Sequence, residues 1–491
     1  MSSLNEPAVK QVPLAVDLDG TLIRTDMMFE SLARLLKQNP LAMLAVPFWW
    51  LRGRAYLKQQ LAARVQVDAA SLPYHEEFLE WLKAEKRNGR PLILATASDI
   101  KMAEPVAQHV GIFDEIIASD GETNLRSTAK LKKLTEKYGE RGFDYAGNSS
   151  VDLGVWVGSR EAIVVNAGES LARRAAQQTK VGQTFLSNSS VAKSLFRSLR
   201  PHQWAKNLIV FLPLLTSHKL PLLTSSDRFV FPMLSAYFAF VAFCLCASGV
   251  YVLNDLMDLE ADRRHPTKRR RPFAAGDVPL SLGLVLAPLL LLGGGFIAWQ
   301  VTTKMDFVAL LLGYIAVTTA YSWHLKRIAI LDVFVLAALY TSRLIAGHIV
   351  TGIEYSAWLL MFSMFIFLSL ALMKRFQELQ ALRRENLQEA KGRGYTADDL
   401  ELVTNMGLVS GFLAVLVMAL YVTSEQVVKL YTHKTLLLLV CPLMLFWLCR
   451  VWFLTHRGQM HDDPTAFAFK DWVSYLIGAL ILGVIWLATG R

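Results

Sequence analysis

The distribution of apolar residues constrains the fold of this chain more than any other feature. Its 491 residues are 53% hydrophobic, but residues 1–185 have the charged composition of a soluble domain, whereas residues 204–490 contain repeated long apolar stretches. A helix that crosses a bilayer needs about twenty apolar residues. The sequence therefore predicts a soluble domain followed by an all-α polytopic membrane bundle. About nine transmembrane helices are expected, at roughly 204–217 (short and amphipathic), 229–253, 281–301, 306–323, 330–350, 357–374, 403–423, 435–455 and 472–489.

Positive charge is concentrated in alternate loops of the apolar region. Most of this Lys and Arg lies in residues 263–271, 326–327, 374–393 and 450–470. A formal net charge of +10 is compatible with nucleic-acid binding, but this alternation is typical of the cytoplasmic loops of membrane proteins. The polar N-terminus lacks the apolar core of a signal peptide. We therefore expect a multi-pass protein of a bacterial-type inner membrane, with its N-terminal domain on the cytoplasmic side and no nucleic-acid partner.

Residues 13–165 alternate short apolar strands with helical patterns, which is typical of an α/β domain with a parallel sheet. Candidate buried strands lie at 14–16, 91–95 and 143–146, and each is followed by polar or small residues. The largely helical residues 26–90 are expected to form a cap. The predicted organisation is a Rossmann-like domain over 1–180, a linker over 181–195 and a membrane domain over 196–491.

One segment of the predicted cap, residues 41–51, is unusually apolar. It is too short to span a bilayer. Burial as a cap helix is the simpler interpretation, and contact with the membrane surface is the alternative.

Two carboxylates, Asp17 and Asp19, directly follow the first predicted strand. A strand-end carboxylate can attack phosphorus and form an aspartyl-phosphate. A second carboxylate two residues later can protonate the leaving oxygen and then activate water. Asn148 and Asp152, which follow the third predicted strand, can complete a Mg²⁺ site with Asp17 and Asp19.

Thr96 offers a hydroxyl to a phosphate group, and Lys130 offers a positive charge to both the phosphate and the nucleophile. This ordered set, which begins with D-x-D-G-T at residues 17–21, resembles the haloacid dehalogenase-like phosphatase superfamily over most of residues 13–165. Asp19 favours a phosphatase over a dehalogenase or an ATPase-type phosphotransferase. Asn148 departs from the family, which often has Asp there, although an amide carbonyl can also bind a metal. A degenerate regulatory domain is the alternative.

Three carboxylates, Asp255, Asp258 and Asp262, lie between the second apolar stretch and the basic run at 263–271. On a continuous helix these spacings place all three on one face, where like charges repel. Shared divalent cations remove that repulsion, and Mg²⁺ is the usual choice for phosphate or diphosphate ligands. The sequence therefore predicts a Mg²⁺ and phosphate site at the membrane edge, next to Asn254.

Several polar residues near the ends of predicted spans are candidate substrate ligands. They are Lys206, Tyr321, Lys326, Asp332, Arg343, Lys374 and Arg375. Arg343 lies about three turns inside its predicted span, a depth at which ionisable residues usually mark a substrate site. Taken singly, the basic residues at span ends are more simply membrane anchors. For the other three residues the alternatives are an interfacial aromatic role for Tyr321 and a structural ion pair between Asp332 and Arg343.

The N-D-x-x-D-x-x-x-D sequence at 254–262 resembles the signature of the UbiA superfamily of membrane prenyltransferases, and the resemblance extends over about residues 195–490. The segment 271–276 matches the same family's loop. The resemblance implies a nine-helix bundle with a polar cavity open to the cytoplasm. An ordinary member joins a prenyl diphosphate to an aromatic acceptor and has a second motif with two acidic residues. Here Asp332 is present, but Leu336 stands at the position of its partner.

Three further segments look like the decaprenyl-phosphate phosphoribosyltransferase branch of that superfamily: R-P-x-Q-W-x-K-N at 200–207, the Tyr321 to Lys326 segment, and the Lys374-Arg375 pair. This branch transfers 5-phosphoribose from phosphoribosyl diphosphate (PRPP) to a polyprenyl phosphate. Such a site holds a diphosphate, a sugar phosphate and a lipid phosphate, so it needs more cations than a site for one diphosphate.

The two resemblances together predict a bifunctional Mg²⁺-dependent membrane enzyme. The membrane half, with Asp255 and Asp262 as catalytic residues, makes polyprenyl-phosphoryl-5-phosphoribose, and the N-terminal half removes its 5-phosphate. One alternative is an aromatic prenyltransferase that uses a polyprenyl diphosphate and carries a phosphatase of unrelated substrate. A non-enzymatic membrane scaffold or transporter is the other alternative.

Overall fold

The computed structural model describes residues 11–120, 125–186, 190–216, 227–301, 305–388, 393–424, 427, 431–460, 463–468 and 470–489. The chain divides into two compact units. The first contains Met1–Leu199 and Tyr251–Ala287, and the second contains Arg200–Val250 and Pro288–Arg491. This division differs from the predicted boundary at residue 196, because the segment that carries the Asp-rich motif belongs to the N-terminal unit.

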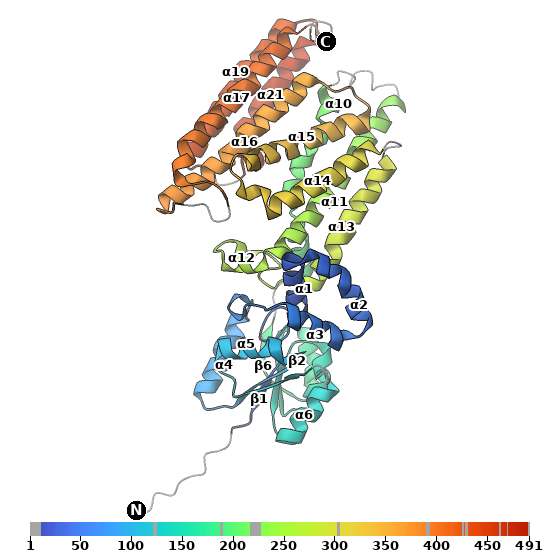
Figure 1. Ribbon diagram of the computed structural model, residues 1–491, viewed down its shortest axis with the longest axis vertical. Helices are drawn as coiled ribbons and strands as arrows, with labels where there is room; N and C mark the ends of the chain where they lie inside the picture. Colours follow the sequence, from blue (N-terminus) through green and yellow to red (C-terminus); the bar gives the residue numbers. More distant parts are fainter. Residues whose placement is uncertain are drawn as a thin grey trace, which may run out of the picture. The chain divides into compact units, whose positions relative to one another are not determined.

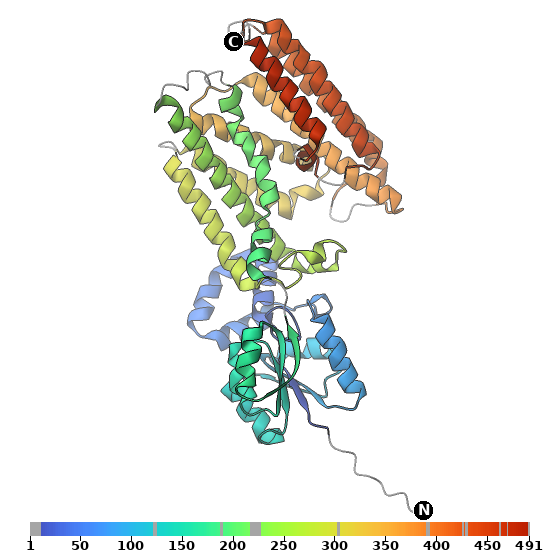
Figure 2. The ribbon, with the colours of Figure 1, turned by 180° about the vertical axis from the view of Figure 1, so that it is seen from behind.

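A six-stranded parallel sheet forms the centre of the first unit, in the order β3-β2-β1-β4-β5-β6 (Figures 1 and 2). The strands are β1 (Leu14–Val16), β2 (Leu92–Asp99), β3 (Glu115–Ser119), β4 (Asp144–Gly147), β5 (Glu161–Ala167) and β6 (Lys180–Leu186). Val16 pairs with Leu94 on one side and with Ala146 on the other, so the carboxyl ends of β1, β2 and β4 lie at one edge. The three predicted strands are confirmed.

Strand β6 corrects the predicted linker, since residues 181–186 belong to the sheet and residues 187–189 lie outside the described part of the chain. The strand lies at the sheet edge, and most of its side chains are exposed. Phe185 is its buried side chain, packed among the core residues. An edge strand with one buried anchor lacks the apolar run that marks a central strand.

Helices cover the sheet and form the cap of the first unit. They are α1 (Met27–Gln38), α2 (Val46–Leu51), α3 (Arg54–Arg64), α4 (Glu76–Arg87), α5 (Ile100–Val110), α6 (Thr128–Tyr138), α7 (Leu153–Trp156), α8 (Glu169–Ala176), α9 (Val191–Ser198) and α12 (Leu259–Arg264). Short 3₁₀ turns are η1 (Pro40–Ala45), η2 (Ala69–Ser71), η3 (Ser150–Asp152) and η6 (Lys268–Arg270).

The prediction that the apolar cap segment is buried is wrong. Leu41, Leu44, Phe48 and Leu51 in η1 and α2 are 76%, 72%, 69% and 83% exposed. Residues on the opposite side of the same turns, including Met43, Val46 and Trp49, pack against the core. The core beneath them is already filled by buried leucines of α1 and α3, so only one side of this short helical segment has apolar partners.

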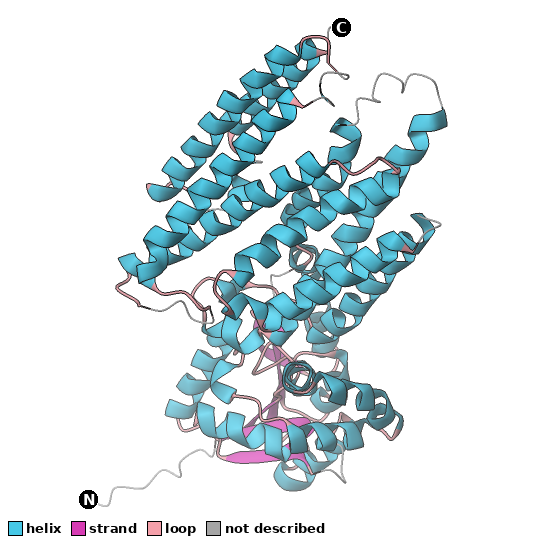
Figure 3. Cartoon of the chain, turned by 45° about the horizontal axis from the view of Figure 1, so that its top comes forward, coloured by secondary structure: helices cyan, strands magenta, loops and turns pink. Residues whose placement is uncertain are grey.

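The second unit is helical. It contains η4 (Pro201–Phe211), α10 (Leu212–Thr216), η7 (Leu325–Arg327), η8 (Ala397–Asp399), η9 (Lys434–Leu439), α14 (Asp306–Trp323), α15 (Leu331–Thr351), α16 (Ala357–Arg384), α17 (Leu400–Thr423), α19 (Val440–His456), α20 (Pro464–Ala468) and α21 (Trp472–Ala488). Helices α11 (Asp227–Met257) and α13 (Leu280–Val301) contribute residues to both units. Among the described residues, the strands (magenta in Figure 3) lie between Leu14 and Leu186.

Seven helices among the described residues are long and apolar enough to cross a membrane, which makes this a multi-pass membrane protein. They are Phe231–Met257, Leu280–Val301, Asp306–Trp323, Leu331–Thr351, Ala357–Arg384, Ala397–Thr423 and Lys434–His456. The other two predicted spans correspond to α21, an apolar helix of 17 residues, and to the short η4 and α10. The predicted count of nine is therefore approximate.

Candidate active sites

The turn after β1 carries Asp17 and Asp19 to the carboxyl edge of the sheet. Gly20 follows with φ +77°, and a Cβ atom there would lie 2.1 Å from the Asn148 Nδ2 atom. Glycine is therefore required both by the left-handed backbone and by the close approach of Asn148. The Thr21 hydroxyl donates a hydrogen bond to Asn148 Oδ1 at 3.3 Å. These contacts bring the loop after β4 against the loop after β1.

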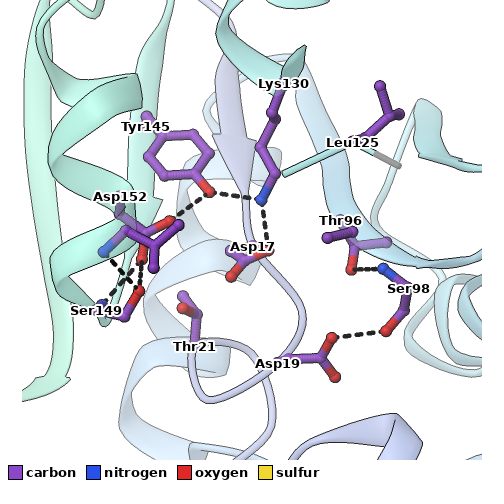
Figure 4. Close-up of polar contacts among 12 residues, drawn as sticks. Asp17, Asp19, Thr21, Thr96, Ser98, Leu125, Lys130, Tyr145, Ser149 and Asp152 are labelled. Atoms are coloured by element: carbon purple, nitrogen blue, oxygen red, sulfur yellow. Dashed lines mark hydrogen bonds and ion pairs between the residues drawn. The ribbon is translucent and has the colours of Figure 1, made fainter. Parts of the chain in front are cut away.

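A hydrogen-bonded chain holds Asp17 (Figure 4). Lys130 Nζ donates to Asp17 Oδ1 at 2.7 Å and to the Tyr145 hydroxyl oxygen at 2.8 Å. The Tyr145 hydroxyl in turn donates to Asp152 Oδ1 at 3.0 Å. Lys130 is 3% exposed, so its ammonium is fixed beside the carboxylate instead of moving in solvent. The predicted contact between Lys130 and a nucleophile at Asp17 is present, whereas Tyr145 was not predicted because it lies within a strand.

Asp152 organises the loop after β4. Its Oδ2 atom accepts hydrogen bonds from the backbone N–H groups of Asn148 and Ser149 at 3.1 and 2.9 Å, and from the Ser149 hydroxyl at 3.0 Å. Ser149 and Asp152 thereby form a capping box at the start of η3. With Tyr145 bound to its other oxygen, Asp152 positions Asn148 and has little free capacity for a metal ion in this arrangement.

Asp19 accepts hydrogen bonds from groups that are not part of the Lys130–Tyr145–Asp152 chain. The Ser98 hydroxyl donates to Asp19 Oδ2 at 2.6 Å, and the backbone N–H of Met27 donates to Oδ1 at 2.8 Å. Thr96 is fully buried next to Ser98, whose backbone N–H donates to the Thr96 hydroxyl oxygen at 3.0 Å. Ser98 is a site residue that the sequence did not single out, although its position two residues after Thr96 at the end of β2 was a usable signal.

The two carboxyl groups hold protons more tightly than ordinary aspartates. Burial raises the pKa of Asp17 to about 7, with Asp152 and Asp19 adding to the rise and Lys130 opposing it. Burial and the charge of Asp26 raise the pKa of Asp19 to about 6, while the Ser98 hydrogen bond opposes the rise. Burial therefore makes the ionised form of both carboxyl groups costly at this site.

A divalent cation bound to these buried carboxylates would offset that cost. Asp17, Asp19 and Asn148 line one pocket of about 550 Å³ and offer the hard oxygen atoms that Mg²⁺ prefers. Among the described residues no three acidic, His or Cys side chains are already gathered in a metal-binding cluster. Backbone carbonyls, the Asn148 amide oxygen and substrate oxygens would therefore complete the coordination.

The Asp-rich segment bends where the sequence predicted one continuous helix face. Helix α11 ends at Met257, Asp258 lies at the junction with φ −100° and ψ 12°, and α12 begins at Leu259. Asp255 and Asp262 are 2% and 3% exposed, whereas the Asp258 side chain is 41% exposed, with its carboxylate 4.0 Å from Lys37 Nζ. The bend therefore brings two of the three carboxylates together.

Arg271 joins Asp255 and Asp262. Its Nη1 atom lies 3.1 Å from Asp255 Oδ1 and 2.6 Å from Asp262 Oδ2. Burial raises the pKa of Asp262, and the Arg271 charge offsets part of that rise. Two buried carboxylates that share one guanidinium form a donor pair able to bind a divalent cation if Arg271 turns toward an anionic ligand. Asn254, the remaining candidate here, lies on α11 one residue before Asp255.

Within the second unit, Lys206 and Lys374 share one carboxylate. Their Nζ atoms lie 3.1 and 3.2 Å from Asp463 Oδ2. Burial alone would raise the pKa of Asp463, but the two lysines and Thr465 hold it below its ordinary value. Lys206 also lies over the Tyr340 ring, 5.6 Å from its centroid. Asp463 was missed because it lies in residues 450–470, a segment that was interpreted only through its positive charge.

A second buried cluster surrounds Asp332, which is fully buried. Arg375 Nε lies 2.7 Å from Asp332 Oδ2, in a charge contact that is not aligned as a hydrogen bond. Arg393 Nη1 lies 3.7 Å from the same oxygen, and the Tyr395 hydroxyl donates to Oδ1 at 2.6 Å. Both arginines also contact Glu378 and donate to the Tyr321 hydroxyl oxygen, at 3.2 and 3.3 Å.

The alternative considered for Asp332 and Arg343, a structural ion pair with each other, is not present. Arg343 Nε donates to Asn207 Oδ1 at 2.7 Å, and Nη2 donates to the Tyr314 hydroxyl oxygen at 3.0 Å. Its guanidinium lies over the Tyr314 ring, 4.9 Å from the centroid. Because Asp332 and Arg343 are three turns apart on α15, the two charges meet different neighbours.

The remaining candidate, Lys326, lies in η7.

Comparison with known proteins identifies both parts of the chain. The UbiA prenyltransferase family matches residues 211–488, and the haloacid dehalogenase-like hydrolases match residues 14–155. The protein y4nM of Sinorhizobium fredii is 38% identical over 476 residues, which cover 96% of this chain and 90% of that protein. A decaprenyl-phosphate phosphoribosyltransferase of Mycolicibacterium smegmatis is 37% identical over 217 residues, 44% of this chain and 66% of that protein.

Among solved structures, a UbiA homolog from Archaeoglobus fulgidus bound to GPP and Mg²⁺ is 15% identical, with a TM-score of 0.45 over 60% of this chain and 99% of that one. Both resemblances that the motifs predicted are confirmed by the matched families. The chain therefore belongs to the UbiA prenyltransferase family and carries an N-terminal haloacid dehalogenase-like domain.

Proposed function

We propose that the membrane half transfers 5-phosphoribose from PRPP to a polyprenyl phosphate, and that the haloacid dehalogenase-like domain then hydrolyses the 5-phosphate of the product. Relatives in Mycolicibacterium, Mycobacterium and Corynebacterium that carry the name decaprenyl-phosphate phosphoribosyltransferase support the first step. The observation that carries the proposal is that the Asp332 carboxylate is already paired with Arg375 and Arg393.

Asp332 is neutralised by the protein itself. Arg375, Arg393 and the Tyr395 hydroxyl surround its carboxylate, and Leu336, one turn along α15, is an apolar residue packed against the α16 core. A carboxylate already paired with two guanidiniums is a poor ligand for a second Mg²⁺, since binding would require breaking a buried ion pair. This arrangement disfavours a prenyl diphosphate as the donor, because its ionisation needs two acidic motifs.

The cations of the second unit suit several phosphate groups. Lys206 and Lys374 share the single carboxylate of Asp463, so the cluster keeps a net positive charge. Either ammonium group can turn toward a phosphate while the other stays paired with Asp463. We assign this lysine pair to the lipid phosphate and the sugar 5-phosphate.

In the transfer step, a lipid phosphate oxygen attacks C1 of the ribose, and the bond from C1 to the diphosphate oxygen breaks. Mg²⁺ held by Asp255 and Asp262 would supply charge neutralisation to the departing diphosphate. Arg271, already placed between these carboxylates, is the protein group able to donate hydrogen bonds to that leaving group. The products are polyprenyl-phosphoryl-5-phosphoribose and diphosphate.

In the hydrolytic step, Asp17 attacks the phosphorus of the 5-phosphate, and the departing ribose oxygen takes a proton from Asp19. Asp19 then accepts a proton from the water that cleaves the aspartyl-phosphate, which releases inorganic phosphate. A pKa of about 6 lets Asp19 serve as acid and then as base near neutral pH. Lys130 neutralises the phosphoryl oxygens and keeps Asp17 oriented.

We further propose that both reactions take place on the cytoplasmic side of a bacterial-type inner membrane. The Asp-rich segment and the N-terminal domain belong to one compact unit, so they share one side of the membrane. The adjoining run 263–271 is basic, as cytoplasmic loops are. Loss of the 5-phosphate would make the preceding transfer hard to reverse.

The test uses purified full-length protein with Mg²⁺, a polyprenyl phosphate, and PRPP labelled with ¹⁴C in the ribose and ³²P in the 5-phosphate. We expect the lipid fraction to gain ¹⁴C without ³²P, and the ³²P to appear as inorganic phosphate. The Asp17→Asn variant should give a lipid that carries both labels.

Absence of ¹⁴C from the lipid would overturn the transfer, and wild-type lipid that keeps ³²P would overturn the coupled hydrolysis. A parallel reaction with a labelled prenyl diphosphate and an aromatic acid tests the aromatic prenyltransferase alternative. Label in the aromatic product would favour that alternative.

A further inference from the structure

The pocket above Asp17 is built from two distant parts of the sequence. Asp17, Asp19, Lys130 and Asn148 line it together with Arg24 of the N-terminal domain. The same pocket is also lined by Gly276, Asp277, Pro279, Leu280 and Ser281, which follow the Asp-rich segment and its basic run. All of these residues lie within the first compact unit. The phosphatase pocket is therefore completed by a loop of the transferase sequence.

Gly276 allows this loop to approach the N-terminal domain. Its φ is +75°, and a Cβ atom would lie 2.5 Å from Arg24 Cβ and 2.7 Å from the Arg24 carbonyl oxygen. A side chain at this position would push the loop away from Arg24. The loop and Arg24 therefore form one continuous wall of the pocket.

Arg24 carries a charge that the described part of the chain does not pair. Its backbone is fixed, since its N–H donates to the Pro73 carbonyl at 2.8 Å. Its Nε atom is buried and lacks a hydrogen-bond partner among the described residues. Asp277, the acid on the facing loop, lies 3.6 Å from Arg197. A buried guanidinium N–H without an acceptor is costly, and a bound anion would satisfy it.

The pocket has more cationic and apolar side chains than a single phosphate group needs for binding. Lys130 faces Asp17, where the scissile phosphate would bind, and Arg24 is separate from that hydrogen-bonded chain. Apolar side chains of Phe29, Pro279 and Leu280 also line the pocket. Arg54, Lys58 and Arg126 line the pocket as well, and Lys58 donates to the Ala97 carbonyl at 2.7 Å. Cations beyond Lys130, beside apolar groups, suit a substrate whose phosphomonoester is joined to another anionic group and to an apolar part.

We propose that Arg24 binds a second anionic group of the phosphatase substrate, the phosphodiester that joins the sugar to a lipid. This inference rests on the proposed function and adds to it a specificity-determining residue. Arg24 and the 276–281 loop would select lipid-linked phosphosugars over free sugar phosphates. The chemistry at Asp17 is the same for both classes.

The test compares two substrates on the full-length enzyme: ribose 5-phosphate, and a short-chain prenyl-phosphoryl-5-phosphoribose that carries the phosphodiester. We expect Arg24→Gln to lower kcat/KM for the diester-bearing substrate about 50-fold, mainly through KM, as loss of one charge-assisted contact does. Hydrolysis of ribose 5-phosphate should change by less than about threefold, because that substrate has no group for Arg24 to bind. Arg24→Lys, which keeps the charge, should recover part of the loss.

Arg87→Gln on the exposed end of α4 is the matched control and should leave both substrates unchanged. An equal loss on the two substrates in Arg24→Gln would overturn the inference while leaving the proposed function intact. Failure of the wild-type enzyme to hydrolyse the diester-bearing substrate would instead overturn the proposed second reaction, and this inference with it. Activity on ribose 5-phosphate shows that each variant is folded.

The exposed apolar face of the cap carries a second, independent inference. Leu41, Leu44, Phe48 and Leu51 are spaced by three, four and three residues, so they form one stripe across η1 and α2. Two exposed arginines, Arg52 and Arg54, follow directly in the chain. An apolar stripe bordered by arginines suits the interface of a bilayer with anionic lipids.

The membrane spans of the same chain imply that a bilayer lies next to this unit. Two candidate membrane spans, α11 and α13, have their ends within the first unit. We infer that the stripe inserts into the lipid interface and holds the cap against the membrane, where a lipid-linked substrate resides. Protein partners of unknown identity are not needed to cover this surface.

The test places a nitroxide at Phe48→Cys in protein whose four native cysteines are replaced by alanine, reconstituted in nanodiscs of phosphatidylcholine and phosphatidylglycerol. We expect the label to be more accessible to lipid-soluble oxygen than to an aqueous nickel complex. A label at Lys83→Cys on polar α4 is the control and should show the opposite preference. The same aqueous accessibility at both sites would overturn the inference.

Discussion

The two carboxylate sites of the first unit, one at Asp17 and one at Asp255 and Asp262, are neutralised in different ways. Asp17 faces Lys130, an ammonium locked in place by Tyr145 and Asp152. Asp255 and Asp262 instead share Arg271, whose side chain is 29% exposed and comes from a loop nine residues further on. The first cation is part of a rigid network, and the second is able to turn toward a ligand. A fixed cation suits a nucleophile that must stay oriented, whereas a movable one suits a site that admits a charged leaving group.

Replacement of the locked carboxylate gives the largest expected effect. Asp17→Asn removes the nucleophile but keeps the side-chain volume, so hydrolysis of ribose 5-phosphate should fall by at least about 10⁴-fold. Phosphoribosyl transfer to the lipid should stay within about twofold, because Asp17 has no part in that chemistry. Phosphate release and lipid labelling measure the two activities on one preparation. Equal loss of both would mean that the two sites do not act as separate centres.

Replacement within the shared pair should reverse this pattern. Asp262→Asn leaves Arg271 with one carboxylate and weakens the binding of a divalent cation, so transfer should fall about 10²–10³-fold. Hydrolysis of ribose 5-phosphate should be unchanged. Glu260→Gln, on the same short helix but paired with Arg34 and Arg264, is the matched control and should keep most of the transfer activity. A comparable loss in Glu260→Gln would assign the effect to the helix and not to the carboxylate.

Much of the phosphatase-like site could be predicted from the sequence because its residues follow strand ends. Parallel strands gather their carboxyl ends at one edge, so Asp17, Thr96 and Asn148 meet whatever the intervening helices do. Tyr145 and Ser98 could not be predicted in the same way. Their contribution depends on which hydrogen bonds they complete, and that is set by packing.

The Asp-rich segment shows the opposite case. Its residue types predicted a cation site, but spacing on an ideal helix misplaced Asp258, because α11 ends before it. The pairing of Asp332 with Arg375 and Arg393 also joins residues on three parts of the chain. Such long-range pairs depend on tertiary packing, which spacing along one helix cannot supply.

A buried ion pair joins the cap to the Asp-rich segment, and its removal tests whether α1 and α12 form one stable body. Arg263 contacts Glu30 at 2.5 Å, and both side chains are more than nine-tenths buried. Glu30→Gln leaves Arg263 buried without a counter-charge, which should destabilise this contact by about 3 kcal/mol. Amide hydrogen exchange of α1 and α12 should then accelerate about 100-fold.

Glu80→Gln, which removes an exposed partner of Lys83, is the control for this loss and should leave exchange in α1 and α12 unchanged. Unchanged protection in Glu30→Gln would show that apolar packing holds these helices together without the ion pair. Faster exchange limited to α1 would show that α12 is held by other contacts.

The smallest expected effect concerns the hydrogen bond that tunes Asp19. Ser98 donates to the ionised form of this carboxylate, so it lowers a pKa that burial has raised. Ser98→Ala should therefore move the Asp19 pKa from about 6 to higher pH by about one unit, since 1.4 kcal/mol corresponds to one unit. The ionised base then forms only at higher pH, so the acidic limb of the kcat profile for phosphate release should shift upward. Ser31→Ala, which removes a buried hydroxyl bonded to the Met27 carbonyl, should leave that limb in place. A downward shift in Ser98→Ala would mean that the hydroxyl stabilises protonated Asp19 instead, which would make acid donation and not base formation the step that Ser98 controls.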